Sequence, residues 1–221
     1  SLAPLQPVIA AIAWGEPATA LIVCMQYLHH LRLAENDAWH APLRQQVFND
    51  AVEHGGLINS LRVEPELGSP ARGGLPDTVA TRRAEGWDIS GHKIYTTGIE
   101  GLRWLAVWAR SDDNPPLVGT WLVPGDSQGI TVVKSWDHAG MRATGSHEVI
   151  FRHVRVAAEH AVDVWPVDAP PAAQAEQGAE QAAAEQHRER GQAARPGAEA
   201  QCERNRAELD GRQGEVCPQV T

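Results

Sequence analysis

The stretch Gly86-Trp-Asp-Ile-Ser-Gly-His-Lys-Ile-Tyr-Thr-Thr-Gly98 decides how the rest of the chain is interpreted. Its alternating apolar residues predict a β-hairpin with a turn at Ser90-Gly91 and a second strand that ends in an aromatic ring, Tyr95. Two hydroxyl residues, Thr96 and Thr97, follow at once. A flat apolar face beside hydroxyl donors suits a planar heteroaromatic ring, although an ordinary half-buried strand end uses the same residues.

Other segments of the chain extend the pattern in a fixed order. They are Trp104–Arg110, Val118–Pro124, Gly129-Ile130, Trp136–Ser146 and Glu148–Val156. Together with the first stretch, this series resembles the middle β-domain of the acyl-CoA dehydrogenases, and the resemblance covers roughly residues 17–163. Several linked motifs in order are more specific than any one of them.

Composition narrows the class of protein. The 221-residue chain carries a formal net charge of −9, which argues against a nucleic-acid partner held through phosphate contacts. Its three cysteines, Cys24, Cys202 and Cys217, have no metal-binding or redox spacing and fit a reducing cytoplasm. The longest apolar run, Ala18–Met25, is too short for a membrane span, and no charged-then-apolar leader precedes it. We therefore expect a cytoplasmic protein without a membrane span.

The residues before position 57 predict helices. A helix over 2–14 is followed by a second that begins at Pro17 and ends near His29 and His30, and a third covers 41–53. The expected buried faces comprise Ala20, Leu21, Cys24, Met25 and Leu28 in the second helix and Leu43, Val47, Phe48, Ala51 and Val52 in the third. The resemblance implies that these helices are the last part of an N-terminal helical domain.

The predicted fold class is α+β. We expect a partial N-terminal helical domain over 1–56, a flavin-binding middle β-barrel domain over 57–163, and a polar tail over 164–221. Within the tail, residues 172–215 are almost wholly Ala, Gln, Glu, Arg and Gly, so they cannot bury enough apolar surface to offset the entropy of ordering. This tail is expected to be disordered, or to be the product of a reading-frame shift, where the resemblance implies a C-terminal helical bundle.

The segment Leu61–Ser69 resembles the family's flavin loop, which carries a Glu-Pro pair followed by Gly-Ser. The resemblance implies that the backbone of Arg62 and Val63 contacts the flavin's pyrimidine edge, and that Gly68 and Ser69 lie near the FAD pyrophosphate. Ser69 is also the implied substrate contact, beside the thioester arm. Val63 replaces a usual threonine, so only backbone contacts are expected there. Without the resemblance, a plain Pro/Gly turn explains the loop.

The resemblance also assigns roles in the first stretch and names FAD as the cofactor. Tyr95 is expected to pack on the flavin, Thr97 to donate a hydrogen bond towards flavin N5, and Thr96 to lie between them. A donor at N5 stabilises the charge of the reduced ring. In relatives the later Trp-to-Ser loop borders the substrate entrance, which makes Arg142 and Ser146 weaker contact candidates.

The reaction implied by the resemblance is α,β-dehydrogenation of an acyl-CoA thioester. In that family a carboxylate removes the α-proton while a hydride passes to the flavin, but no position in this sequence matches the base, so no catalytic residue is assigned. An electron-transfer acceptor and a homo-oligomer are the implied partners. The hypothesis is a flavin site that is only half complete, with weak FAD binding and little turnover.

Two alternatives stay open at this point. Flavin-dependent monooxygenases of the same fold have similar sequence motifs in this β-domain, and they need reduced flavin and oxygen. A non-catalytic remnant, folded as a small β-domain without flavin, is the other. A cooperative melting transition without any flavin binding would favour the remnant.

Overall fold

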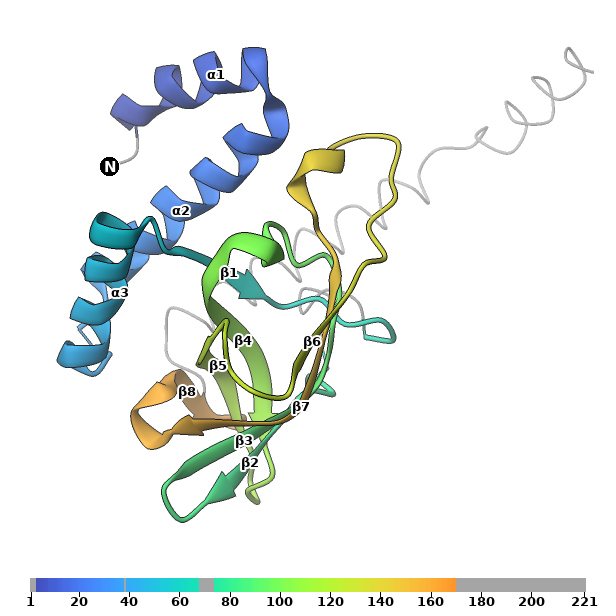
Figure 1. Cartoon of the computed structure of the whole chain (residues 1–221). Coiled ribbons are helices and arrows are strands. Elements are labelled where there is room, and N and C mark those ends of the chain that lie inside the picture. The colour runs from blue at the N-terminus through green and yellow to red at the C-terminus, as the bar shows by residue number, and fades with distance from the viewer. Residues whose placement is uncertain (1–2, 38, 68–73, 170–221) are drawn as a thin grey trace, which may run out of the picture. The chain divides into compact units, whose positions relative to one another are not determined.

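The computed structural model of the chain describes residues 3–37, 39–67 and 74–169 (Figure 1). The predictions for Gly68, Ser69 and nearly all of the polar tail lie outside these residues. The described part begins with helices and continues as a curved, mostly antiparallel sheet, so the α+β prediction is confirmed.

Three α-helices come before the first strand: α1 (Gln6–Gly15), α2 (Pro17–Glu35) and α3 (Ala41–His54). The carboxylate of Glu16 caps α2 by accepting hydrogen bonds from the backbone N–H groups of Ala18 and Thr19. Gly55, in the left-handed conformation at φ 64°, ends α3. Because α2 continues to Glu35, the prediction that His29 and His30 lie at its end is wrong.

The expected buried faces of the helices are only partly right. In α2 the buried residues are Ala18, Ala20 and Leu33, while the side chains of Leu21 and Leu28 are exposed. In α3 the prediction holds for Leu43 and Val47 and fails for Val52, which is 85% exposed. The 3.6-residue period identifies an apolar stripe, but how much of it is covered depends on the layer packed against it.

Eight strands form one sheet. They are β1 (Leu57–Leu61), β2 (Val79–Arg83), β3 (Gly86–Lys93), β4 (Leu102–Ser111), β5 (Leu117–Pro124), β6 (Ile130–Val133), β7 (Glu148–Ala157) and β8 (Ala161–Pro166). The order across the sheet is β6-β7-β3-β2-β4-β5-β8, and β1 runs parallel to β4 beside β2. Strands β4, β5 and β7 match the segments named from the sequence closely, whereas β8 was not predicted.

Strand β3 corrects the central prediction, because Ser90-Gly91 is not a turn. The strand runs straight through this pair, which makes a bulge in the antiparallel pairing of β3 with β7. The hairpin turn lies earlier, at Ala84-Glu85 between β2 and β3. Gly91 is needed for close approach instead: a Cβ there would lie 2.4 Å from Thr78 Oγ1.

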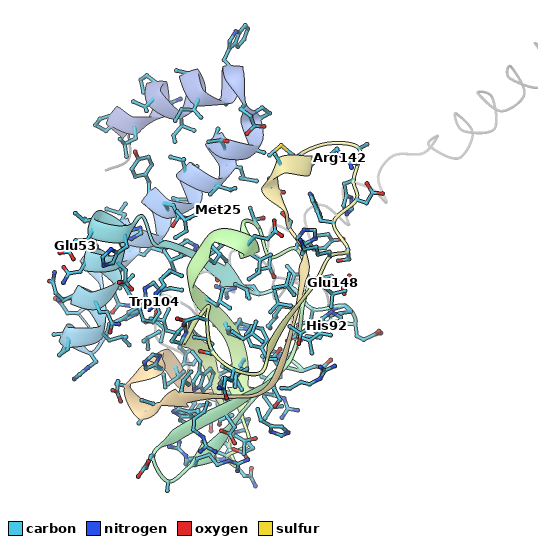
Figure 2. All side chains as sticks on the ribbon, in the orientation of Figure 1. Met25, Glu53, His92, Trp104, Arg142 and Glu148 are labelled. Atoms are coloured by element: carbon cyan, nitrogen blue, oxygen red, sulfur yellow. The ribbon has the colours of Figure 1, made fainter. Side chains whose placement is uncertain are left out.

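Strand β4 divides the apolar interior in two. Leu105 and Val107 point into the core enclosed by the curved sheet, while Trp104 and Ala106 pack in a second cluster with Val47 of α3. This alternation is the two-residue period of a strand that is covered on both faces. Figure 2 shows Trp104 on the side of the sheet that carries α3.

Polar side chains join the helical part to the sheet. The indole N–H of Trp39 and the amide of Asn36 both donate to the carboxylate of Asp163 on β8, at 3.0 and 2.7 Å. The indole N–H of Trp104 donates to Asp50 of α3 at 2.9 Å. These directional bonds set how α3 and the loop before it meet the sheet, which apolar contact alone does not specify.

Candidate functional site

The loop after β1 is fastened to β3 by a buried ion pair. The ammonium of Lys93, the last residue of β3, lies 2.6 Å from Glu64 Oε1, and both side chains are almost fully buried. The same carboxylate accepts hydrogen bonds from Thr78 Oγ1 at 2.6 Å, from the Thr78 N–H at 3.0 Å and from the Asp77 N–H at 2.7 Å. The pair therefore joins three segments: the loop, the entry to β2 and the end of β3.

Burial and pairing shift both titrations of this ion pair. Burial disfavours the ammonium and lowers the pKa of Lys93 to about 8, although Glu64 opposes the shift. Burial also acts to raise the pKa of Glu64, but the hydrogen bonds from Lys93 and Thr78 outweigh it and leave that pKa below its ordinary value. The pair is thus ionised near neutral pH. The sequence placed Glu64 and Lys93 in two separate motifs, and it gave no sign that the two side chains pair.

Tyr95 lies just beyond the end of β3 in a conformation that bulky residues rarely adopt. Its φ is 56°, in the left-handed region, and its side chain is 54% exposed. Its ring meets Trp136 edge to face at a centroid distance of 6.2 Å, and His138 stacks on Trp136 at 3.9 Å. The backbone N–H of Ile94 donates to Val63 O at 3.0 Å, which brings the loop after β1 beside Tyr95. Strained exposed positions of this kind cluster at ligand sites.

The two threonines after Tyr95 have different surroundings. The Thr96 side chain is 1% exposed, and its hydroxyl has no hydrogen-bond partner among the described residues. Thr97 keeps a small exposed area, and its Oγ1 lies 3.0 Å from Ser146 Oγ. Of the two predicted hydroxyl contacts, only the Thr97 hydroxyl therefore has a hydrogen-bond partner among the described residues.

Hydroxyl groups continue from Thr97 into the loop before β7. Ser146 Oγ lies 2.7 Å from Thr144 Oγ1, and the Thr144 hydroxyl donates to the Met141 carbonyl at 2.8 Å. The main chain follows the same route, since the Gly98 N–H donates to Thr144 O at 2.7 Å. The sequence singled out Ser146 only as a weak contact and missed Thr144, although the Thr-Gly-Ser spacing places both hydroxyls in one short turn.

A hollow of about 120 Å³ opens beside Tyr95. Its lining residues are Ile94, Tyr95, Ser135, Trp136, His138, Ser146 and Glu148. Glu148, at the start of β7, pairs with His92 of β3 at 2.8 Å, and Figure 2 shows these two side chains next to each other. The hollow thus has aromatic walls, a hydroxyl from Ser146 and a carboxylate at its rim.

The side chains of two further predicted residues, Arg62 and Arg142, have partners of their own. The guanidinium of Arg62 lies 4.2 Å from the ring centroid of Trp108 on β4, so only its backbone remains for the predicted cofactor contact. Arg142, at the tip of the loop before β7 (Figure 2), pairs with Asp137 at 2.7 Å and is largely exposed. The structure therefore brings Val63, Tyr95 and Thr97 together and leaves the Arg62 and Arg142 side chains outside that group.

A larger hollow of about 650 Å³ lies elsewhere, between the end of α3 and the start of β4. Its charged groups are already paired, because Arg103 contacts both Asp50 and Asp126, at 3.5 and 2.6 Å. It lacks the exposed aromatic ring and the hydroxyl row that surround Tyr95. Size alone therefore does not make it the better candidate.

No helix within the described residues is long and apolar enough to cross a membrane.

Comparison with known proteins places this geometry in context. Residues 62–154 match the family described as acyl-CoA dehydrogenase, middle domain. A Bacillus subtilis (strain 168) protein named as an acyl-CoA dehydrogenase, YdbM, is 32% identical over 143 residues, which are 65% of this chain and 37% of the relative. An L-evernosamine nitrososynthase of Micromonospora is 30% identical over 159 residues, with 63% and 38% of the two chains covered.

Among solved structures, KijD3 in complex with FMN and a dTDP-linked amino-keto sugar superimposes with a TM-score of 0.61 at 25% identity. The superposition covers 71% of this chain and 38% of KijD3. The chain thus spans less than two fifths of the length of each of these three relatives. The matched part contains the segments that form the site around Tyr95.

Proposed function

Since the chain belongs to the acyl-CoA dehydrogenase family through the middle domain at residues 62–154, we propose that it supplies the β-domain half of a flavin site in an oxidoreductase. The observation that carries this proposal is the group at the end of β3: an exposed, left-handed Tyr95 followed two residues later by the Thr97 hydroxyl. An aromatic face and a hydroxyl edge side by side suit the face and the polar edge of an isoalloxazine ring.

The residues present fit a flavin. The ring of Tyr95 and the hydroxyl of Thr97 would contact it, with the backbone of Arg62 and Val63 reaching its pyrimidine edge. When bound, the flavin supplies the redox chemistry, and the chain's own residues bind it, orient it and hydrogen-bond its edge.

The division of the chain forms part of the proposal. We assign 1–56 to the end of a helical domain, 57–163 to the flavin-binding β-domain and 164–221 to a polar tail, whose first residues, 164–166, complete strand β8. Gly68 and Ser69 are proposed to approach the pyrophosphate, with Ser69 also near the substrate.

The whole protein's activity is proposed to be FAD-dependent α,β-dehydrogenation of an acyl-CoA thioester in the cytoplasm, by a homo-oligomer that passes electrons to a transfer partner. This follows the named similarity to an acyl-CoA dehydrogenase. No carboxylate of this chain is assigned as the base that removes the α-proton. Acyl-CoA-dependent reduction of a dye by the purified chain would show that the chain does carry such a base.

A second candidate function is flavin-dependent oxygenation. Its support is the similarity to a nitrososynthase and to KijD3, whose structure holds FMN and an amino-keto sugar. The two candidates differ in the flavin form that starts the reaction, because a dehydrogenase begins with oxidised flavin and an oxygenase with reduced flavin. Dye reduction by acyl-CoA tests the first, and oxygen consumption with reduced flavin tests the second.

Flavin binding to the full chain is the direct test of the site. Titration with FMN and FAD, followed by quenching of flavin fluorescence, is expected to show saturable binding. Tyr95→Ala is expected to weaken it by about 3- to 10-fold, the worth of one aromatic stacking contact. Trp14→Ala is the matched control, because Trp14 is 95% exposed and lies on α1, and this change should leave the affinity unchanged. Absence of binding by the folded wild-type chain would reject the proposal and favour the non-catalytic remnant.

A further inference from the structure

Three hydroxyl groups and a carbonyl form an unbroken row beneath the proposed flavin edge. The contacts are Thr97 Oγ1 to Ser146 Oγ at 3.0 Å, Ser146 Oγ to Thr144 Oγ1 at 2.7 Å, and Thr144 Oγ1 to Met141 O at 2.8 Å. Ser146 and Thr144 are 5% and 1% exposed, so little water can compete for these bonds. Thr97, at the end of the row opposite Met141, is the residue predicted to face flavin N5.

The direction of the row follows from proton counting. A carbonyl oxygen only accepts, so Thr144 must donate its single hydroxyl proton to Met141 O. Ser146 must then donate to Thr144, which has no second proton to give. Thr97 must in turn donate to Ser146. Only this direction gives each of the three contacts a proton, and it turns the Thr97 proton inwards, away from the ligand edge.

The inner end of the row is held in place by its surroundings. Met141 O also accepts the indole N–H of Trp136 at 3.1 Å and the backbone N–H of Thr144 at 3.1 Å. This carbonyl therefore stays at the inner end of the row, and reversing the row would remove its bond from the Thr144 hydroxyl. The row thus keeps the donor of Thr97 engaged with Ser146 and leaves only the acceptor lone pairs of Thr97 for a further partner.

Oxidised and reduced flavin differ at N5, the atom that Thr97 is predicted to face. In the oxidised ring N5 carries a lone pair and accepts a hydrogen bond, whereas in the reduced ring N5 carries a hydrogen and donates one. An outward lone pair on Thr97 complements the reduced form. Binding of the oxidised form requires the Thr97 proton to leave Ser146, at the cost of one buried hydrogen bond.

We propose that Thr144 and Ser146 are positioning residues that turn the Thr97 hydroxyl proton inwards, so that the site binds reduced flavin in preference to oxidised flavin. This inference rests on the proposed function, since it needs a flavin at Tyr95 and Thr97. The hydroxyl row would then determine which redox form of the flavin binds first. A preference for reduced flavin favours the oxygenase candidate over the dehydrogenase candidate.

The test measures the dissociation constants of oxidised FMN and of anaerobically reduced FMN for the full chain. The wild-type chain is expected to bind the reduced form more tightly. In Thr144→Val, Ser146 is free to donate to Thr97, whose own proton can then point outwards; the preference for reduced FMN should fall about fivefold, the worth of one hydrogen bond. Thr144→Ser keeps the row and should behave as the wild type.

Ser146→Ala gives a second route to the same result, because it removes the acceptor that holds the Thr97 proton. It should shift the preference in the same direction as Thr144→Val, and Ser146→Thr should restore it. Equal or tighter binding of oxidised FMN by the wild type, or an unchanged preference in both hydroxyl-deleted variants, would overturn the inference while leaving the flavin site intact. Failure of the folded wild-type chain to bind either form would overturn both the inference and the proposed function.

Discussion

Thr96 and Thr97 are neighbours with opposite surroundings, and the difference lies in their hydroxyl groups. The Thr97 hydroxyl belongs to a row that ends at a carbonyl, while the Thr96 hydroxyl is buried without a partner in the described part of the chain. A buried hydroxyl that lacks a partner costs free energy, because it has lost water and gained nothing. Of the three residues 95–97, only Tyr95 is exposed, and Thr96 is the most deeply buried.

At this scale Thr96→Val is expected to raise the free energy of unfolding by about 1 kcal/mol, because valine fills the same volume without the unsatisfied hydroxyl. Thr144→Val is the matched comparison, since the Thr144 hydroxyl makes two buried contacts, and it should lower the free energy by about 1 kcal/mol. Urea unfolding of both variants without flavin measures the two values. Equal signs for the two variants would contradict this account of the threonine pair.

At the scale of elements, β3 carries the site because it pairs along most of its length on both sides. Strand β2 binds one edge from Gly86 to Ser90, and β7 binds the other as far as Lys93. The residues after Lys93 leave the ladder, which frees Tyr95 to adopt its left-handed backbone. A strand fixed on both edges is a rigid support for a binding group.

The start of β3 depends on Gly86. Its φ is 154°, and a Cβ at this position would lie 2.1 Å from Val156 O of β7. Gly86→Ala is therefore expected to lower the free energy of unfolding by about 2–4 kcal/mol through backbone displacement. Gly140→Ala is the control, because a Cβ there meets nothing within 4 Å. The melting temperatures of the two variants should differ clearly. Coincident melting curves would show that β7 accommodates the added methyl group without a loss of stability.

At the scale of the whole molecule, the buried pair of Lys93 and Glu64 links the stability of the fold to pH. The pKa of Lys93 is about 8 in the folded chain, against about 10.4 when unfolded. Between these values the unfolded chain holds more protons, so the free energy of unfolding should rise with pH from about 8 to 10. The lowered pKa of Glu64 acts at acidic pH. The Glu64 carboxylate stabilises the fold above its unfolded pKa, and this stabilisation is lost as the pH falls through its folded pKa.

The measurement is chemical unfolding of the wild type and of the double variant Glu64→Gln/Lys93→Met across both windows. The difference between the two proteins should grow by about 1–3 kcal/mol in favour of the wild type from pH 8 to 10, and shrink below about pH 4. The double variant is used because removing one partner alone would leave a buried charge unpaired. A difference that stays flat or falls above pH 8 would mean that Lys93 is not desolvated as the structure shows it.

Much of the fold was predictable from local pattern. Pro17 and Gly55 mark helix boundaries because each has a backbone preference that acts within one turn. The apolar alternation of β4 and β7 predicts strands, since side chains of a strand alternate between its faces. At the candidate site, the aromatic-plus-hydroxyl character of Tyr95 and Thr97 was also visible, because these residues are adjacent in the chain.

What the tertiary structure alone decided depends on pairing between distant segments. Ser90-Gly91 looks like a turn, yet it is a bulge because β7 pairs with β3 on both sides of it. The partner of Lys93 is 29 residues away, and Thr97 meets Ser146 across 49 residues. Local sequence therefore determined the elements and the chemistry at the end of β3, while the direction of the Thr97 proton was set by a row of hydroxyls that only folding brings together.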